Sequence, residues 1–137
     1  ITDNPYDFSF SGVKSAVLNY INGCRMKQIP IVEADIAASF QKAVTDVLIE
    51  HAMAAVKESR IKKLAIAGGV AANGVLRRGM QEACQRRGIE FFYPTPIFCT
   101  DNAAMIGTAA YYEYLSGKRD GWDLNAIPNL KLGQARD

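Results

Sequence analysis

Apolar and polar positions recur with two different periods along the chain, and each period predicts a type of element. Residues 7–11 alternate polar and aromatic side chains, which is typical of a half-buried strand. Residues 13–21 fit a short helix that ends at Asn22 and Gly23. From Asp35 to about Ser59, apolar side chains return every three or four residues, which predicts a long helix with Asp35 as its N-cap. The apolar stripe of that helix comprises Ile36, Phe40, Val44, Val47, His51 and Ala55.

The second half of the chain alternates short apolar runs with helical patterns. Residues 64–67 are expected to form a strand buried on both faces, and residues 89–93 a second strand. Helices are expected over 73–87 and 102–115, each followed within two residues by a glycine that ends it. This order predicts an α/β architecture in which a helix connects two parallel strands. Two strands make a thin sheet for so many helices, so we expect part of the sheet to lie outside this chain.

Composition places the chain among ordinary globular domains. Its 137 residues are 49% hydrophobic and 22% charged, which is close to the average for such domains. Disorder, collagen-like repetition and a disulfide scaffold are therefore excluded, and a single domain is expected. Within it we expect a strand over 1–11, a helical part over 13–59, a strand–helix–strand–helix region over 62–117 and an irregular tail over 118–137.

Charge and cysteine content indicate which partners and which cellular compartment to expect. The formal net charge of +2 is too small to identify a nucleic-acid-binding protein by itself. The three cysteines lack CxxC spacing, which favours reduced thiols and a cytoplasmic location. The longest apolar runs fall far short of the ~20 residues that a membrane-spanning helix needs, so we expect no membrane association.

A pair of glycines separates the first strand from the helix that follows it. Gly68 and Gly69 lack side chains, so the backbone can approach a ligand closely, and a helix N-terminus favours an anion. Asn73 would then offer its amide to a ribose hydroxyl or a base edge. The alternative is a tight turn in which Asn73 only caps the helix. Both interpretations remain open from the residues alone.

Asp101 follows the second strand and lies where the last helix is expected to begin. It therefore belongs to the same end of the sheet as the glycine pair. A carboxylate there is suited to bind a divalent metal ion. The alternative is that Thr100 or Asp101 caps the helix. One carboxylate does not form a metal site, so the other ligands would have to come from elsewhere.

The remaining polar and reactive side chains favour structural roles. His51 stands on the apolar stripe of the long helix, which indicates a boundary residue rather than a base. Cys99 lies among apolar residues and is interpreted as packing. No nucleophile has a partner base at a recognisable spacing, which argues against a serine hydrolase or another protease. Six basic residues either contact phosphates or, as we expect, lie on solvated helix faces. They are Lys62, Lys63, Arg77, Arg78, Arg86 and Arg87.

Four motifs occur in order along the chain and together carry a resemblance. They are Asp7-Phe8-Ser9-Phe10-Ser11-Gly12-Val13-Lys14, Asp35-Ile36-Ala37-Ala38-Ser39-Phe40-Gln41, Ala67-Gly68-Gly69-Val70-Ala71-Ala72-Asn73 and Cys99-Thr100-Asp101-Asn102-Ala103-Ala104-Met105. This set resembles the carboxy-terminal part of the TsaD family, the tRNA adenosine threonylcarbamoyltransferases. The tail over 124–130 is similar to that of the bacterial branch, and the resemblance covers nearly the whole chain.

The resemblance implies an incomplete carboxy-terminal lobe of an actin-like, Hsp70-like, sugar-kinase-like ATPase fold. Family members transfer the threonylcarbamoyl group from threonylcarbamoyl-AMP to N6 of adenosine 37 in tRNAs that read codons beginning with A. Asn73 matches the family's adenylate-contacting asparagine, and Gly68 and Gly69 match the glycine turn beside the nucleotide. Asp101 matches the aspartate that binds the metal, which is iron or zinc. The implied partners are tRNA, TsaB and TsaE.

The chain departs from the family pattern at the metal site. The family's two metal-binding histidines belong to an HxxxH motif in the amino-terminal lobe, and this chain contains a single histidine. We therefore expect the chain to be inactive alone, with its sheet completed by the amino-terminal lobe, another chain or a swapped copy. Two other functions remain open. They are a non-catalytic scaffold of the same fold, as TsaB is, and a kinase or ATPase of the same superfamily.

Overall fold

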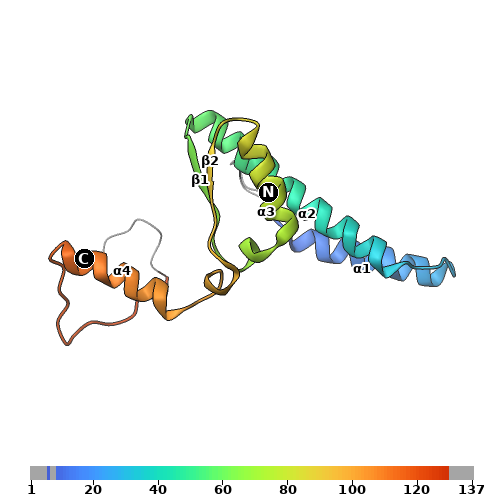
Figure 1. The fold of residues 1–137 in the computed structure, drawn as a ribbon. Coiled ribbons are helices and arrows are strands. Elements are labelled where there is room, and N and C mark those ends of the chain that lie inside the picture. The colour runs from blue at the N-terminus through green and yellow to red at the C-terminus, as the bar shows by residue number, and fades with distance from the viewer. Residues whose placement is uncertain (1–5, 7–8, 130–137) are drawn as a thin grey trace. The chain divides into compact units, whose positions relative to one another are not determined.

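The computed structural model describes Tyr6 and residues 9–129, which belong to two compact units. The first unit is Ile1–Thr100 and the second is Asp101–Asp137. Figure 1 traces the elements of both, and the described residues contain four α-helices and two strands. None of the described helices is long and apolar enough to cross a membrane.

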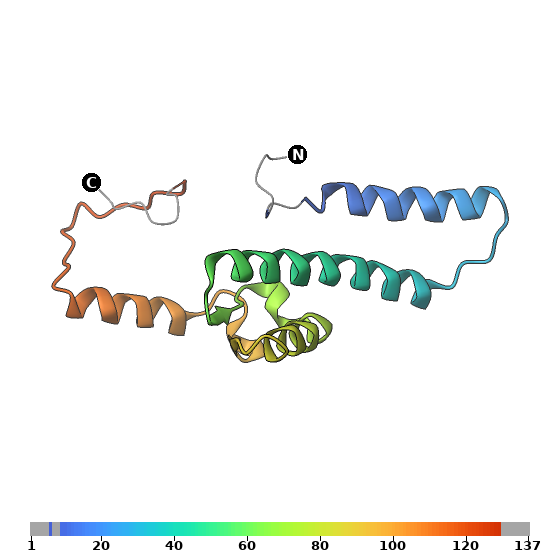
Figure 2. The ribbon, with the colours of Figure 1, turned by 90° about the horizontal axis from the view of Figure 1, so that it is seen from above.

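Two antiparallel helices form the beginning of the first unit. Helix α1 (Ser11–Met26) and helix α2 (Glu33–Ser59) run side by side and are joined by residues 27–32 (Figure 2). An apolar groove of about 440 Å³ lies between them, and its lining includes Val17, Tyr20, Ile36 and Phe40. The first helix continues past Gly23, where we expected it to end. A glycine inside a helix costs only about 1 kcal/mol, and burial of Cys24 keeps the next turn packed.

Two expectations for the amino-terminal part are not met. Of the strand predicted over 7–11, residues 7 and 8 lie outside the described residues, Ser9 and Phe10 are not in a strand, and Ser11 begins α1. The N-cap of α2 is Val32 rather than Asp35, which lies inside the first turn. An acidic side chain is stabilised there by the helix dipole as it would be at the cap. The sequence pattern therefore did not distinguish an aspartate at the N-cap from one in the first turn of the helix.

The α/β part has the predicted order of elements. Strands β1 (Lys63–Ala65) and β2 (Glu90–Phe92) pair in parallel, with Leu64 opposite Phe91. Helix α3 (Gly74–Gln85) makes the connection between them. The core lies between α2, α3 and one face of the sheet. Its buried members are Met53, Val56, Leu76, Met80, Ala83, Cys84 and Ile89.

The first strand is not buried on both faces, as the sequence had suggested. Leu64 is half-buried and packs against the core, whereas Ala65 on the other face is exposed. Phe92 of β2 is also on that other face and is 45% exposed. A parallel sheet ordinarily has both faces covered. Within the described residues this face is bare. The expectation that part of the sheet lies outside this chain concerns additional strands and stays a prediction.

The described part of the second unit contains helix α4 (Ala103–Leu115). Apart from Thr108 and Glu113 its residues are apolar or aromatic, and every residue of the helix is exposed. Asn102 is the N-cap, and its side-chain oxygen accepts a hydrogen bond from the backbone N–H of Met105 at 2.9 Å. Gly117 follows the helix with φ +87°, a left-handed conformation that favours glycine. A helix that is apolar on all sides is typical of a buried position.

Candidate functional site

The glycine turn, residues 68–72, follows β1 and depends on glycine at its first position. Gly68 has φ +86° and ψ 173°, a region of backbone space that is essentially closed to residues with a side chain. Its carbonyl accepts the backbone N–H of Ala71 at 3.0 Å, and the 3-10 turn η1 (Gly69–Ala72) results. At Gly68 and Gly69 the chain thus presents backbone rather than side chains, just after the carboxyl end of the strand.

Asn73 ends this turn and caps α3. Its side-chain oxygen accepts hydrogen bonds from the backbone N–H groups of Val75 and Leu76 at 2.9 and 3.0 Å. Its amide nitrogen donates to Oε1 of Gln41 on α2 at 3.1 Å. The capping interpretation is therefore confirmed. The amide carries two N–H donors, so the bond to Gln41 accounts for one of them. Asn73 can therefore cap α3 and still donate one hydrogen bond to a ligand.

The connector, residues 94–100, follows β2 and comes back to the glycine turn. Thr100 Cγ2 lies 4.0 Å from the point where a Cβ on Gly69 would be. The two segments that follow the parallel strands therefore meet at one end of the sheet. This is the place where open α/β sheets bind ligands.

Arg77 joins the glycine turn to the connector. Its Nε donates to the carbonyl of Ala71, and its Nη2 donates to the carbonyl of Pro94 at 2.8 Å and to Cys99 Sγ at 3.1 Å. The guanidinium also lies over the ring of Tyr93, 4.8 Å from the ring centre. Arg77 is half-buried and bonded to protein groups. It therefore fits neither of the two roles considered from the sequence, which were a phosphate contact and a position on a solvated helix face.

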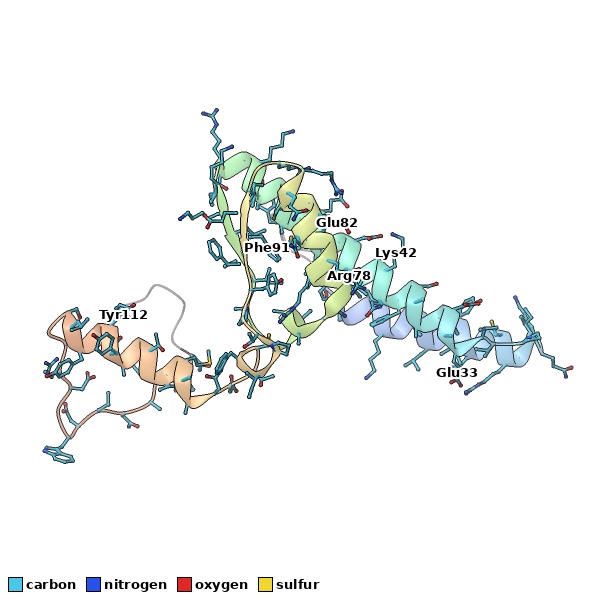
Figure 3. All side chains as sticks on the ribbon, viewed as in Figure 1. Glu33, Lys42, Arg78, Glu82, Phe91 and Tyr112 are labelled. Atoms are coloured by element: carbon cyan, nitrogen blue, oxygen red, sulfur yellow. The ribbon has the colours of Figure 1, made fainter. Side chains whose placement is uncertain are left out.

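The other five basic residues are exposed, as expected, but only Arg78 lies within a helix. Lys63 belongs to β1, and Arg87 follows α3 and donates to the Met53 carbonyl at 3.3 Å. Arg78 lies on α3, as does the acidic Glu82 (Figure 3). Arg86 is an exposed side chain that lies 4.0 Å from Glu82. Exposed pairs of this kind contribute little to stability.

His51 and Cys99 have the structural positions that the sequence indicated. His51 is half-buried, and its Nδ1 lies 3.3 Å from the backbone oxygen of Tyr6. The phenol of Tyr6 donates to the Glu58 carboxylate, and this hydrogen bond is the main cause that raises the pKa of Tyr6 above its ordinary value. Cys99 is 3% exposed, and its thiol lies within 3.5 Å of the Thr95 carbonyl. Burial at that position confirms its role in packing.

Asp101 begins the second unit and is exposed. Neither Thr100 nor Asp101 is the N-cap of α4, because Asn102 occupies that position. The capping prediction for these two residues is therefore wrong. Within the part of the chain that the structure describes, no three His, Cys, Asp or Glu side chains are grouped so that they could hold a metal ion. Asp101 thus offers one carboxylate, and the described residues do not form a metal site.

Sequence reasoning missed the contact of Gln41 with Asn73 and gave Arg77 the wrong roles. Arg77 lies one turn after the cap, in a region of the helix where the dipole disfavours a positive charge. A cation there signals specific acceptors and could have been noticed. Gln41 precedes Asn73 by 32 positions, and nothing local in the sequence indicates that the two meet.

Comparison with known proteins agrees with the four motifs. A family model described as TsaD, tRNA N6-adenosine threonylcarbamoyltransferase, matches residues 1–108. A tRNA N6-adenosine threonylcarbamoyltransferase from Clostridium botulinum (strain 657 / Type Ba4) is 55% identical over 132 residues, which are 96% of this chain and 39% of that protein. A protein of the same description from Clostridium novyi (strain NT) is 59% identical over 128 residues, or 93% of this chain and 38% of the relative.

The chain spans about two fifths of the length of these curated relatives, since it covers 38–39% of each. The matched region contains the glycine turn, Asn73, the connector and Asp101. Because the family model matches most of the chain, and the relatives match nearly all of it, the chain belongs to the TsaD family of tRNA N6-adenosine threonylcarbamoyltransferases.

Proposed function

We propose that this chain forms the carboxy-terminal lobe of a cytoplasmic enzyme that transfers the threonylcarbamoyl group from threonylcarbamoyl-AMP to N6 of adenosine 37 in tRNA. The proposed fold is that of the actin-like, Hsp70-like and sugar-kinase-like ATPases, with the other lobe outside this chain. Family membership supports the reaction type. One structural observation supports the proposed site. A turn that only glycine can form leads directly into Asn73, which caps α3 and has an amide that donates hydrogen bonds.

The glycine turn and Asn73 would hold the adenylate part of the substrate. Backbone without side chains at Gly68 and Gly69 lets a nucleotide approach the end of the sheet. The cap bonds fix the Asn73 amide plane, because its oxygen accepts two backbone N–H groups and its nitrogen is held by Gln41. The second amide N–H then meets a ribose or base acceptor at little further entropic cost.

The transfer forms a bond between N6 of the adenosine and the carbamoyl carbon. It breaks the bond from that carbon to the phosphate oxygen and releases AMP and a proton. What this chain contributes is orientation of the adenylate, so that the reacting carbon lies within reach of the amine. A site held by fixed dipoles needs no rearrangement during the reaction.

Asp101 would supply one carboxylate ligand to a divalent metal ion, iron or zinc, whose histidine ligands lie outside this chain. A carboxylate suits either ion. Since the described residues do not form a site by themselves, we assign no step to the metal. TsaB, TsaE and tRNA are the partners proposed for the complete protein, and this chain alone is expected to be inactive.

Two other functions make different predictions. A non-catalytic scaffold like TsaB would retain the fold but would not need Asn73 or Asp101 for any reaction. A kinase or ATPase of the same superfamily would use the glycine turn for ATP and would hydrolyse it. Transfer of labelled threonine into tRNA and hydrolysis of ATP, measured on the same protein, separate the three.

The test uses a chimaera in which this chain replaces the matching 38% of the Clostridium novyi relative. With threonylcarbamoyl-AMP, tRNA, TsaB, TsaE and ATP present, we expect threonine transfer. Asp101→Ala should abolish it, whereas Asp120→Ala, a change at another exposed aspartate of the second unit, should leave it intact. No transfer by a folded wild-type chimaera would favour the scaffold.

A further inference from the structure

The two segments that carry the proposed site follow different strands, and their relative position has to be fixed. The glycine turn with Asn73 follows β1, and the connector that leads to Asp101 follows β2. The connector is irregular apart from one short 3-10 turn, η2 (Pro96–Phe98). The backbone hydrogen bonds within the connector, such as that from Cys99 to Pro96, are local, so contacts with other segments fix its place relative to the glycine turn.

The Arg77 side chain bonds to both segments. One edge of its guanidinium, Nε, donates to the Ala71 carbonyl in the glycine turn. Its Nη2 donates to two acceptors in the connector, the Pro94 carbonyl at 2.8 Å and Cys99 Sγ at 3.1 Å. The acceptors lie in different segments, so a single planar group sets the spacing between them.

The geometry points to Arg77 as a positioning residue for the transfer reaction: it holds the connector that leads to Asp101 in register with the glycine turn and Asn73. This inference rests on the proposed function. Arg77 acts through the segments it joins, because its bonded donors are directed at protein acceptors rather than at a ligand.

Lysine cannot replace this arrangement. The guanidinium is flat and rigid, presents donors on two edges and stacks on an aromatic face, here that of Tyr93 at 4.8 Å. An ammonium group has the same charge, but its three donors share one nitrogen, so it cannot match acceptors spaced for two edges of a guanidinium. A misplacement of about 1 Å in a catalytic arrangement can cost roughly a hundredfold in rate. We therefore expect Arg77→Lys to lower kcat by about tenfold to a hundredfold.

The experiment compares Arg77→Lys and Arg77→Met with wild type in the chimaera with the Clostridium novyi relative. Arg86→Met is the matched control, because it removes a positive charge from the end of the same helix where the side chain is exposed. Thermal melting curves give the fraction of each variant that is folded at the assay temperature. Rates of transfer at varied threonylcarbamoyl-AMP then give kcat and KM per folded enzyme. Both Arg77 variants should lose kcat by a larger factor than KM rises, and Arg86→Met should lose neither.

A second readout does not need the reaction. The backbone N–H of Ala71 bonds to Gly68 at 3.0 Å and that of Cys99 bonds to Pro96 at 3.1 Å, one in each segment. Hydrogen exchange at both amides should accelerate together in the Arg77 variants and stay at the wild-type rate in Arg86→Met. Unchanged exchange, or full kcat in folded Arg77→Lys, would overturn the positioning role. A wild-type chimaera without transfer would instead refute the proposed function, and the exchange measurement would still decide whether Arg77 joins the segments.

Discussion

Asn73 caps α3 and is the proposed substrate contact, and a pair of substitutions separates these two roles. Asn73→Ala removes two bonds to the N-terminus of α3, at 2.9 and 3.0 Å, and the bond to Gln41 at 3.1 Å. Loss of a cap costs about 1 kcal/mol, and loss of a hydrogen bond between elements costs about 1 kcal/mol more. The opening equilibrium of α3 should therefore shift by about 2 kcal/mol, a factor of about 30.

Asn73→Asp keeps the cap oxygen and places a negative charge at the helix N-terminus, where the dipole favours it. The Gln41 amide can turn so that its nitrogen donates to the new carboxylate. We therefore expect α3 to open as rarely as in wild type, while the amide donor proposed for the substrate is lost.

Hydrogen exchange of the Met80 amide, which lies inside α3 and does not bond to Asn73, measures the opening of α3 in the chimaera, and threonine transfer to tRNA measures the activity. Asn73→Ala should accelerate exchange by about 30-fold and abolish transfer. Asn73→Asp should abolish transfer at nearly the wild-type exchange rate. If Asn73→Asp opens α3 as much as Asn73→Ala does, the capping argument is wrong. If Asn73→Asp retains full transfer, the side chain does not donate to the substrate.

Three further predictions concern packing, pH and exposed surface. In Gly79→Ala the new methyl would lie 2.6 Å from Ile49 Cδ1, so we expect destabilisation by about 1 kcal/mol from overpacking despite the better helix former. Adding Ile49→Val, which removes that carbon, should recover the loss in urea unfolding. Burial raises the pKa of the Cys84 thiol, with the charge of Arg87 opposing the shift. The thiol of the unfolded chain therefore loses its proton at a lower pH than the buried thiol does. The free energy of unfolding should fall as the pH rises from the pKa of the unfolded thiol towards that of the folded one, and Cys84→Ala should remove that part of the pH dependence. Finally, the isolated chain should bind a hydrophobic fluorescent dye through its exposed apolar residues, which include Phe92 at 45% exposure, and the chimaera should bind much less.

The sequence predicted the α/β part of the fold well because each signal there is local. Gly88, for example, has φ +63° after α3, as its position at the end of the helical pattern indicated. The predicted parallel pairing follows from strand, helix and strand in order, and Leu64 indeed lies opposite Phe91. The short alternating run at residues 7–11 gave a weaker signal, since a strand exists only where another strand can bond to it. In the described part of that run, Phe10 instead accepts the N–H of Val13 at the start of α1.

The candidate site was predicted in part for the same reason. The cap at Asn73 follows from local chemistry and was confirmed, whereas the cap of α4 is one or two residues later than expected. Asn102, Asp101 and Thr100 are all good capping residues, so only the backbone conformation decides among them, and Asn102 has the extended φ of −152° that a cap requires. The roles of Gln41 and Arg77 depend on contacts between distant segments, which a single sequence does not reveal.

The placement of Arg77 on α3 has a consequence for how the site keeps its geometry. Asn73 is the cap of this helix and Arg77 lies one turn further along it, so both are attached to the same rigid element. The helix is in turn fixed by Leu76 and Met80, which are 4% and 2% exposed in the core. A site on a packed helix is more exact than one held by loops alone. The glycine turn and the connector can thus remain irregular, as close approach of a ligand requires, because each is bonded to a helix that is packed into the core.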